Sequence, residues 1–168
     1  MEPRALYFEN QKTRTRLFIE KAVFECLECS SWNMLSITQV CQMAQISRKT
    51  FYRHYGSLEQ CIKEWFEKLE NEYLSKTDLL EGYDPNRIRQ ELFSFFAPYR
   101  PQLAVLAKAG YPLDELFLQT ARRVIDHRAG GQAGESLILF SSGGFLALWK
   151  AWILQETDLP AQAVRPAK

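Results

Sequence analysis

The pattern that most limits the fold is a pair of short helical segments, 37–44 and 48–55, separated by a tight turn. A serine precedes each segment, Ser36 before the first and Ser47 before the second. A serine oxygen at that position accepts a hydrogen bond from a free backbone amide of the first turn, which defines where the helix starts. Two short helices joined by a tight turn, after a longer leading helix, are the parts of a helix-turn-helix unit.

The longer leading helix is predicted from apolar residues that recur at helical spacing between Leu17 and Leu27. We expect this helix to cover residues 13–29, after a short, polar and flexible arm at residues 1–11. The short segments and their turn supply apolar residues spaced to form a small core beneath the unit: Val40, Ala44, Ile46 and Phe51.

The remaining sequence also has helical spacing, with no β-alternation and no internal repeat. Gly56 stands where a left-handed residue ends a helix, and Ser57 and Gln60 are spaced as a capping box at the start of the next one. Further helices are expected at 86–97, 102–108, 113–128 and 133–156. The sequence therefore predicts an all-α fold: an N-terminal three-helix helix-turn-helix domain at 12–56, a linking helix at 57–80, and a C-terminal helical bundle at 81–168 that dimerises.

The second short helix has a polar face that suits contact with DNA. In a helix-turn-helix unit this helix enters the major groove, where arginine and lysine pair with guanine or phosphate and hydroxyls donate to phosphate. The net charge of the chain is only +1, although its first 55 residues are basic and its remainder is acidic. On spacing alone, a solvated helix with a few charges is an equal alternative. The polar residues are Ser47, Arg48, Lys49, Thr50, Tyr52, Arg53 and His54.

A family resemblance favours the DNA-binding interpretation. Residues 13–66 resemble the DNA-binding domain of the TetR family of bacterial regulators, of the AcrR type. The run LSITQVCQMAQISRKTFYRHY, residues 35–55, resembles its helix-turn-helix signature, and residues 46–55 are the most specific part. His54 at a helix end is also consistent with a surface cap. The resemblance implies DNA contact by Ser36, Thr38, Ser47, Arg48, Lys49, Thr50, Tyr52 and His54, to which the polar face adds Arg53.

The sequence departs from the family pattern at two positions that affect DNA binding. Gln45 stands where the family has a turn glycine, and a residue other than glycine with positive φ costs roughly 1 kcal/mol there. Leu58 replaces a lysine that often contacts phosphate in the family. Loss of one phosphate contact weakens binding and lowers its salt dependence by about one unit of slope. The first helix offers cations that compensate: Lys12, Arg14 and Arg16.

The apolar stretch 137–154 is predicted as a bundle or interface helix. Lys150 and the small residues 141–144 interrupt it, whereas a membrane span needs about 20 predominantly apolar residues. Its part from 140 to 152 resembles the last helix of the dihydroxyacetone-kinase-regulator-like (DhaS-like) regulators. A core helix within one chain is the alternative. The expected dimer-interface residues are Ser141, Gly143, Gly144, Phe145, Leu148 and Trp152.

The C-terminal bundle is also where TetR-like proteins bind an inducer. Aromatic residues are candidates to line such a pocket, although an aromatic stripe is more often part of a core. Some DhaS-like members respond to a protein partner, so a small-molecule inducer and a protein co-regulator both stay open. The candidate pocket residues are Phe93, Phe96, Tyr99, Tyr111 and Phe117.

The sequence holds no constellation typical of an enzyme. Its two histidines, His54 and His127, accompany no Ser/His/Asp or Cys/His set and no glycine-rich phosphate loop. We therefore expect no catalytic residues, no cofactor and no metal. Cys26 and Cys29 have the spacing of zinc or redox pairs, but they lie in a helical pattern, so packing is preferred and redox sensing stays open.

Together these features predict a DNA-binding transcription regulator, expected as a repressor, that binds a palindromic operator as a homodimer and is released by a small ligand. The N-terminus lacks the apolar run of a secretory signal, so we expect a cytoplasmic protein without membrane attachment. The alternative is a TetR-like interaction module or co-regulator that has lost strong DNA binding, which Gln45 and Leu58 favour.

Overall fold

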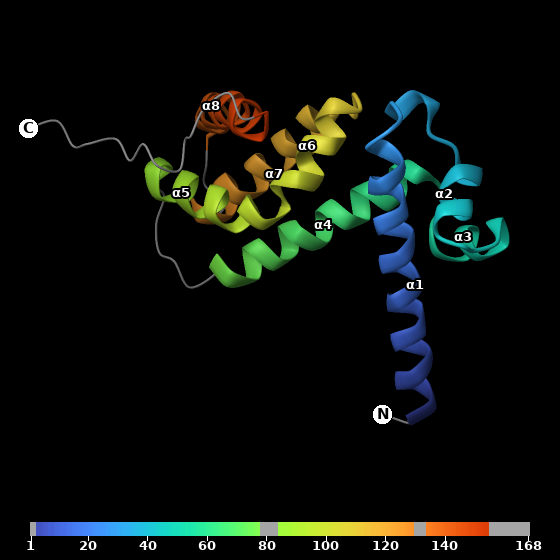
Figure 1. Ribbon diagram of the computed structural model, residues 1–168. Helices are drawn as coiled ribbons and strands as arrows, with labels where there is room; N and C mark the ends of the chain where they lie inside the picture. The colour runs from blue at the N-terminus through green and yellow to red at the C-terminus, as the bar shows by residue number, and fades with distance from the viewer. Residues whose placement is uncertain (1–2, 78–83, 130–133, 155–168) are drawn as a thin grey trace, which may run out of the picture. The chain divides into compact units, whose positions relative to one another are not determined.

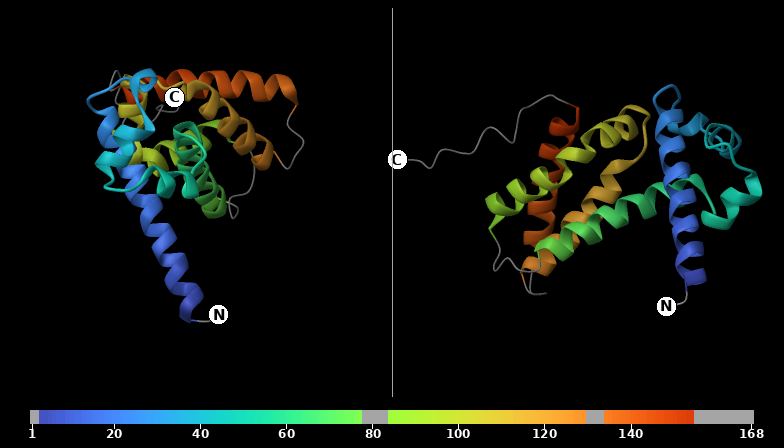
Figure 2. Two further views of the ribbon diagram at one scale, coloured as in Figure 1. Left: turned by 90° about the vertical axis from the view of Figure 1, so that its right-hand side faces the viewer. Right: turned by 60° about the horizontal axis from the view of Figure 1, so that its bottom comes forward.

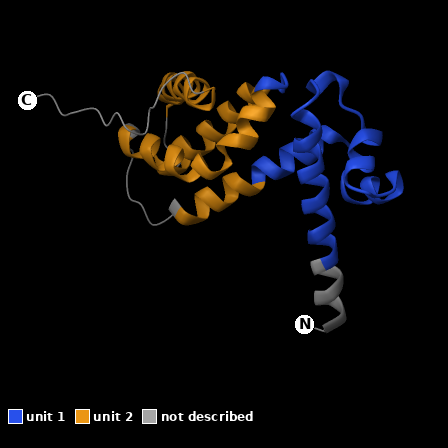
Figure 3. Cartoon of the chain, viewed as in Figure 1, with its two compact units in different colours: residues 1–67, 108–111 blue, residues 68–107, 112–168 orange. Residues whose placement is uncertain are grey.

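The fold is all-α in the computed structural model, which describes residues 3–77, 84–129 and 134–154 and has no strand within them (Figure 1). The chain divides into two compact units (Figure 3). The N-terminal unit comprises residues 1–67 and 108–111. The body unit comprises residues 68–107 and 112–168. The predicted fold class is confirmed, and each unit is described by itself below.

The N-terminal unit is built on the long helix α1, against which two short helices pack. After α1 (Pro3–Leu27) come a 3-10 turn η1 (Trp32–Met34), α2 (Ile37–Met43), α3 (Arg48–His54) and the first part of α4 (Leu58–Thr77). Helices α2 and α3 pack on each other, and both contact α1. The buried apolar residues of this unit include Ile19, Val23, Leu27, Val40, Cys41, Phe51, Tyr55, Cys61, Ile62 and Phe66.

Helix α1 corrects the prediction of a flexible arm at residues 1–11 for its described part, residues 3–11. The helix begins at Pro3, ten residues before the expected start at Thr13. Proline is favoured in the first helical turn, and the segment that follows is rich in residues with high helix propensity, such as Ala5 and Leu6. Apolar periodicity marked only the part of the helix that packs on α2 and α3, because it reports burial and not helicity.

The turn after α2 has the geometry of a Schellman motif. The amide of Ile46 donates to the carbonyl of Cys41 at 2.9 Å, and the amide of Gln45 donates to the carbonyl of Gln42 at 3.2 Å. Gln45 adopts φ 53°, the left-handed conformation that this motif requires. The predicted positive φ at Gln45 is thus confirmed, and the side chain carries the strain that a glycine would avoid.

Gly56 differs from its predicted role. Among the described residues, Gly110 is the glycine with a positive φ, and Gly56 is not left-handed. Instead, the amide of Gly56 donates to Oε1 of Gln60 at 2.8 Å, while the amide of Gln60 donates to Oγ of Ser57 at 3.0 Å. A Cβ at Gly56 would lie 2.9 Å from Oε1 of Gln60. That atom is the end of a flexible side chain, which can shift, so neither backbone conformation nor crowding requires glycine at this position.

The body unit contains the second part of α4, followed by α5 (Pro85–Phe96), η2 (Ala97–Tyr99), most of α6 (Arg100–Lys108), α7 (Leu113–Arg128) and α8 (Glu135–Ile153). The expected helix at 113–128 is confirmed. No helix was expected over residues 98–101, but Pro98 and Pro101 each stand in the first turn of a new helical segment. Proline is tolerated there because those amides lack a helical partner in any case. The predicted end of the last helix at 156 lies outside the described residues.

The core of the body unit is dominated by aromatic rings from α5, α7 and α8. Figure 2 shows these three helices in two further views. Phe117 stacks on Trp149 with ring centroids 4.5 Å apart. Phe96 meets Trp149 edge-on at 5.0 Å, and Phe93 meets Trp152 at 5.2 Å. Aromatic pairs in these arrangements stabilise a core beyond the area they bury, so these contacts fix α8 on the body.

Candidate nucleic-acid interface

Helix α3 presents one exposed polar face. Arg48, Lys49, Tyr52 and Arg53 are exposed, whereas Phe51 between them is fully buried. Positions 48 and 52, and positions 49 and 53, are four residues apart and therefore lie on the same side of the helix. Burial of Phe51 fixes the rotation of α3, because any other rotation would expose its ring. The exposed face thus carries three cations and one tyrosine. The residue Tyr52 is 49% exposed.

No acidic group neutralises this face among the described residues. The helix itself contains no aspartate or glutamate, and Arg48, Lys49 and Arg53 form no ion pair with the rest of the described chain. The side chain of Tyr52 lies in hydrogen-bonding contact with Arg48 and raises the pKa of the guanidinium. The face is therefore positively charged at every physiological pH, which suits contact with phosphate and guanine.

The hydroxyl groups at the starts of α2 and α3 serve the backbone. Oγ of Ser47 accepts from the amide of Thr50 at 3.0 Å and lies 2.9 Å from its Oγ1. Oγ of Ser36 accepts from the amide of Gln39, whose Oε1 accepts in return from the amide of Ser36 at 2.8 Å. The predicted N-caps are confirmed. These serines position the helices, whereas Thr38, in the first turn of α2, is exposed.

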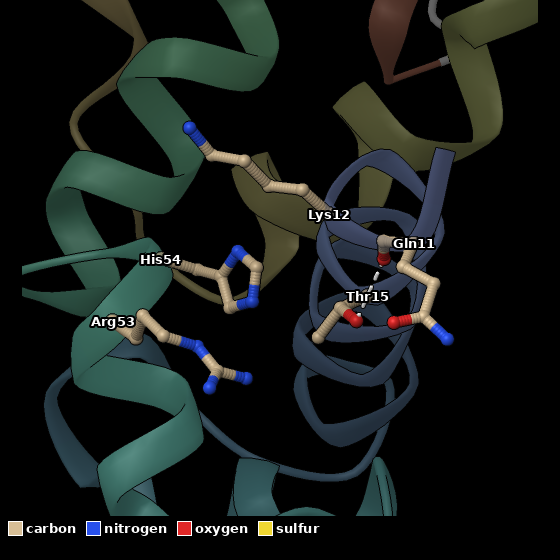
Figure 4. Close-up of a pocket in the computed structure, with 5 residues that line it drawn as sticks. All are labelled: Gln11, Lys12, Thr15, Arg53 and His54. Carbon is tan, nitrogen blue, oxygen red and sulfur yellow. Dashed lines mark hydrogen bonds between the residues drawn. The ribbon is translucent and has the colours of Figure 1, made fainter. Parts of the chain in front are cut away.

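His54 lies apart from the exposed face. Its side chain is half-buried and, together with Gln11, Lys12, Thr15 and Arg53, lines a cavity between α1 and the end of α3 (Figure 4). Both ring nitrogens are buried and have no hydrogen-bond partner among the described residues. The predicted DNA-contacting residues of α3 therefore divide. Arg48, Lys49 and Tyr52 belong to the exposed face alone. Arg53 borders both that face and the cavity, and His54 faces α1.

The exposed face is supported by a buried hydrogen bond that the sequence did not predict. The hydroxyl of Tyr55 donates to Oε1 of Glu20 at 2.8 Å, and both residues are buried. Arg16 lies over the Tyr55 ring at 4.5 Å from its centroid and pairs with Glu64. Arg16 was a candidate phosphate contact, but its charge is used inside the unit. The signal available beforehand was a glutamate at position 20 within the apolar stripe of α1.

The predicted dimer-interface residues occupy two sides of α8. Phe145 and Trp152 are buried inside the protomer, and Trp152 is only 2% exposed. This burial corrects their assignment to an interface, because α8 uses them to pack on its own bundle. Leu148 is half-buried, and so is Ser141, while Gly143 and Gly144 are exposed. The outward side carries additional apolar residues that the prediction omitted: Leu137, Leu139 and Phe140.

The predicted pocket residues do not lie together. Phe93, Phe96 and Phe117 belong to the aromatic core around Trp149. Tyr99 lies beside Phe95, with centroids 6.1 Å apart. Tyr111 belongs to the N-terminal unit, where its ring meets Trp32 edge-on at 4.7 Å. The expectation of one pocket formed by all five residues is therefore corrected.

The paired cysteines show no sign of a metal site. Cys26 is half-buried and Cys29 is exposed, and both are free thiols. Burial, followed by the charge of Glu25, raises the pKa of Cys26, which lowers the thiolate fraction on which reactivity depends. Among residues 3–77, 84–129 and 134–154, no group of three potential ligands is close enough to hold a metal ion.

Helix α8 has the length and composition of a membrane span, and 28% of its apolar window is buried. A core helix of a bundle passes the same test. Here α8 packs along α7 and places Phe145, Trp149, Trp152 and Ile153 in the core. Packing in the body unit thus explains the apolar residues on the inner side of α8. It does not explain the apolar residues on the outward side.

Comparison with known proteins finds a solved structure with a similar fold. No protein-family profile matches the chain, and no curated protein matches its sequence. Among solved structures, the chain is similar to the dihydroxyacetone kinase operon activator DhaS, with a TM-score of 0.62 and 16% sequence identity. The similarity covers 87% of this chain and 88% of that one. The chain therefore shares the fold of that protein over nearly its whole length.

Proposed function

We propose that this chain is a sequence-specific DNA-binding regulator of transcription. The observation that carries the proposal is the exposed face of α3. Arg48, Lys49 and Arg53 stand there beside Tyr52, without acidic neighbours on the helix, on a short helix whose rotation is fixed by Phe51. A helix of this kind, at the end of a helix-turn-helix unit, fits the major groove and presents hydrogen-bond donors to guanine and phosphate.

The structural neighbour supports a role in regulation. It is named as an operon activator, and its fold is shared over 87% of this chain. Whether a bound regulator represses or activates depends on where its operator lies relative to the promoter. We therefore propose regulation in a cytoplasmic setting and keep repression, the expectation from the sequence, as one of its two outcomes.

We further propose that the regulator acts as a homodimer through the outward side of α8. Leu137, Leu139 and Phe140 are exposed there, and the side chain of Phe140 is 85% exposed. A Cβ at Gly143 or Gly144 would meet nothing within 4 Å, so packing inside the protomer does not require these glycines. Exposed apolar patches mark interaction sites, and a two-fold pair of α3 helices matches a palindromic operator.

Control by a small ligand or by a protein partner is the remaining part of the proposal. Phe93, Phe96 and Phe117 pack against tryptophans of α8 in a closed aromatic cluster. A ligand that enters this region would have to displace rings from one another. A protein partner that binds the surface of the body unit requires no such opening and is equally compatible with the proposal.

The test is selection of bound duplexes from a random DNA pool by the purified full chain. At about 0.1 M salt, binding through phosphates alone is already weakened, so enrichment reports sequence recognition. We expect an enriched inverted repeat. The variant Lys49→Ala/Tyr52→Ala is expected to lose the enrichment, and Arg122→Ala, which removes an exposed charge from α7, is expected to keep it.

Absence of enrichment from a folded and dimeric protein would contradict the DNA-binding proposal. The alternative, an interaction module that has lost strong DNA binding, would then be preferred. Two observations fit that alternative: the strained Gln45 in the turn and the half-buried Leu58 in place of a phosphate-contacting lysine.

A further inference from the structure

The cavity between α1 and the end of α3 has the properties of an anion site. Its volume is about 340 Å³, and its lining residues come from two turns of α1 and from the last turn of α3. Figure 4 shows the side chains of Lys12, Arg53 and His54 around one space between the two helices. A single water takes up about 30 Å³ in the liquid, so the cavity has room for a tetrahedral oxyanion and bound water.

The charge of the cavity is positive. Lys12 and Arg53 contribute two cations, and the described residues that line the cavity include no carboxylate. Neither cation has an ion-pair partner among the described residues. Arg16 lies on the same helix, but Glu64 pairs with it. Two lining cations without a counter-ion are therefore available to a ligand.

The imidazole of His54 has buried nitrogens without a hydrogen-bond partner among the described residues. Buried side-chain nitrogens are nearly always hydrogen-bonded, and each exception calls for an explanation. Both nitrogens of His54 are buried without a partner in the described part of the chain. A neutral imidazole has one donor and one acceptor, whereas a protonated imidazole has two donors. An anion in the cavity would accept from the protonated ring and complete its hydrogen bonding.

We propose that this cavity binds a tetrahedral oxyanion, such as a phosphate group, and that His54 takes up one proton from solvent when the anion binds. Lys12 and Arg53 neutralise the anion, and His54 donates to it as an imidazolium. No covalent bond forms or breaks. The site shares Arg53 with the exposed face of α3, but it does not rest on the proposed function, because a free oxyanion would occupy it whether or not the chain binds DNA.

The charges around His54 determine in which direction anion binding changes with pH. Burial, then Arg53 on α3 and Arg16 and Lys12 on α1, lower the pKa of His54 below its ordinary value of 6.5. On α4, Glu64 is engaged by Arg16. An anion between these cations reverses the repulsion and raises the pKa of the ring again. Binding of the anion therefore strengthens as the pH falls from about 7 towards about 5.

The test uses the fact that the chain has only two histidines. The imidazole resonances of the full chain are followed by NMR from about pH 5 to about pH 8, in sodium chloride and in sodium sulfate of equal ionic strength. Sulfate is the probe because it keeps its charge over this range. His127, exposed on α7, is the internal control, and its signal is expected to be the same in the two salts.

In sulfate, we expect the titration midpoint of His54 to rise by about one unit. Equal midpoints in the two salts would overturn the proposal. The variant Lys12→Gln/Arg53→Gln is expected to lose the rise, and Arg122→Gln, an exposed charge in the body unit, is expected to keep it. A rise that persists without both lining cations would also overturn the proposal, since the anion would then bind elsewhere.

A second arm of the experiment identifies the source of the phosphate. A stoichiometric DNA duplex is added in chloride, and a rise of the His54 midpoint assigns the site to a backbone phosphate. A rise in sulfate but not with the duplex supports the site and assigns it to a free phosphate or a small phosphorylated molecule. Enriched DNA sequences without either rise would contradict this site but leave the proposed function intact.

Discussion

Tyr55 and Glu20, which lie 35 positions apart in the sequence, form a buried hydrogen bond of 2.8 Å beneath the exposed face of α3. The bond joins the residue that ends α3 to the middle of α1. Arg16 covers the Tyr55 ring from the same side of α1. The orientation of the helix that we propose to bind DNA thus depends on a polar contact inside the core.

Replacement Tyr55→Phe is expected to lower the free energy of unfolding by about 1–3 kcal/mol, since a buried carboxylate loses a donor. Tyr52→Phe, at an exposed position, is expected to change it by less than about 0.5 kcal/mol. Denaturant unfolding at pH about 7 measures both. A loss as small for Tyr55→Phe as for Tyr52→Phe would show that the hydrogen bond contributes nothing to stability.

The stability difference between wild type and Tyr55→Phe is also expected to depend on pH in the alkaline range. Burial, the nearby Cys61 and Glu20 raise the pKa of Tyr55 above its ordinary value of 10.0. A raised pKa in the folded state stabilises the protein below that ordinary value and ceases to do so as the pH rises above it. We expect the difference in unfolding free energy between wild type and Tyr55→Phe to shrink above about pH 10. A difference that grows there would contradict the assignment.

Replacement Gln45→Gly is expected to raise the free energy of unfolding by about 1 kcal/mol. Glycine adopts the left-handed conformation of the Schellman turn without the steric cost that a side chain carries. For a chain of this size, this gain raises the unfolding temperature by about 2–4 °C. Gln42→Gly, inside α2 and also exposed, is the control and is expected to destabilise by about 0.5–1 kcal/mol.

Replacement of Lys49 and Tyr52 by alanine is expected to abolish operator binding. The far-ultraviolet circular dichroism spectrum is expected to stay unchanged, and the protein is expected to sediment as a dimer. Both side chains are exposed, so their loss leaves the core intact. Lys49→Ala alone is expected to lower the salt dependence of binding by about one unit of slope if it contacts a phosphate. Loss of helicity together with binding would show that these side chains support the fold and do not dock on DNA.

Replacement Phe140→Glu is expected to shift the protein from dimer to monomer without unfolding it. The side chain is 85% exposed in the protomer, and a charge there disfavours an apolar contact between two copies. Sedimentation is expected to show twice the chain mass of 19.6 kDa for the wild type and that mass for the variant. Met34→Glu, at another exposed apolar residue, is expected to remain dimeric. A wild type that sediments as a monomer would contradict the proposed interface.

Local features of the fold were predictable because neighbours in the chain determine them. Ser36 and Ser47 cap helices through amides three residues away. Gln45 occupies a left-handed turn that depends only on the preceding helical turn. The bounds predicted for the helix at 113–128 are those of α7. Propensity, capping and turn chemistry act over a few residues and can be recognised without a structure.

The roles of individual side chains could not be read in the same way. The sequence assigned Arg16 to phosphate and Trp152 to a dimer interface, and it did not reveal the surroundings of His54, whose contact with DNA stays a prediction. In the structure, Arg16 pairs with Glu64, 48 positions away, His54 lines a cavity against α1, and Trp152 packs against Phe93 of α5. Apolar periodicity states that a helix has a buried side, but not which partner covers it or which polar group is drawn in with it.

By itself, therefore, the sequence determined an all-α chain, the starts of its short helices, the turn between them and the polar character of α3. Only the tertiary structure decided, within the described residues, which cations remain unpaired on the surface, which histidine nitrogens have no partner, and which side of α8 faces outward. The physical reason is the distance along the chain over which each kind of interaction acts. Backbone hydrogen bonds and caps form within a helical turn, whereas burial and charge pairing arise between residues brought together by the fold.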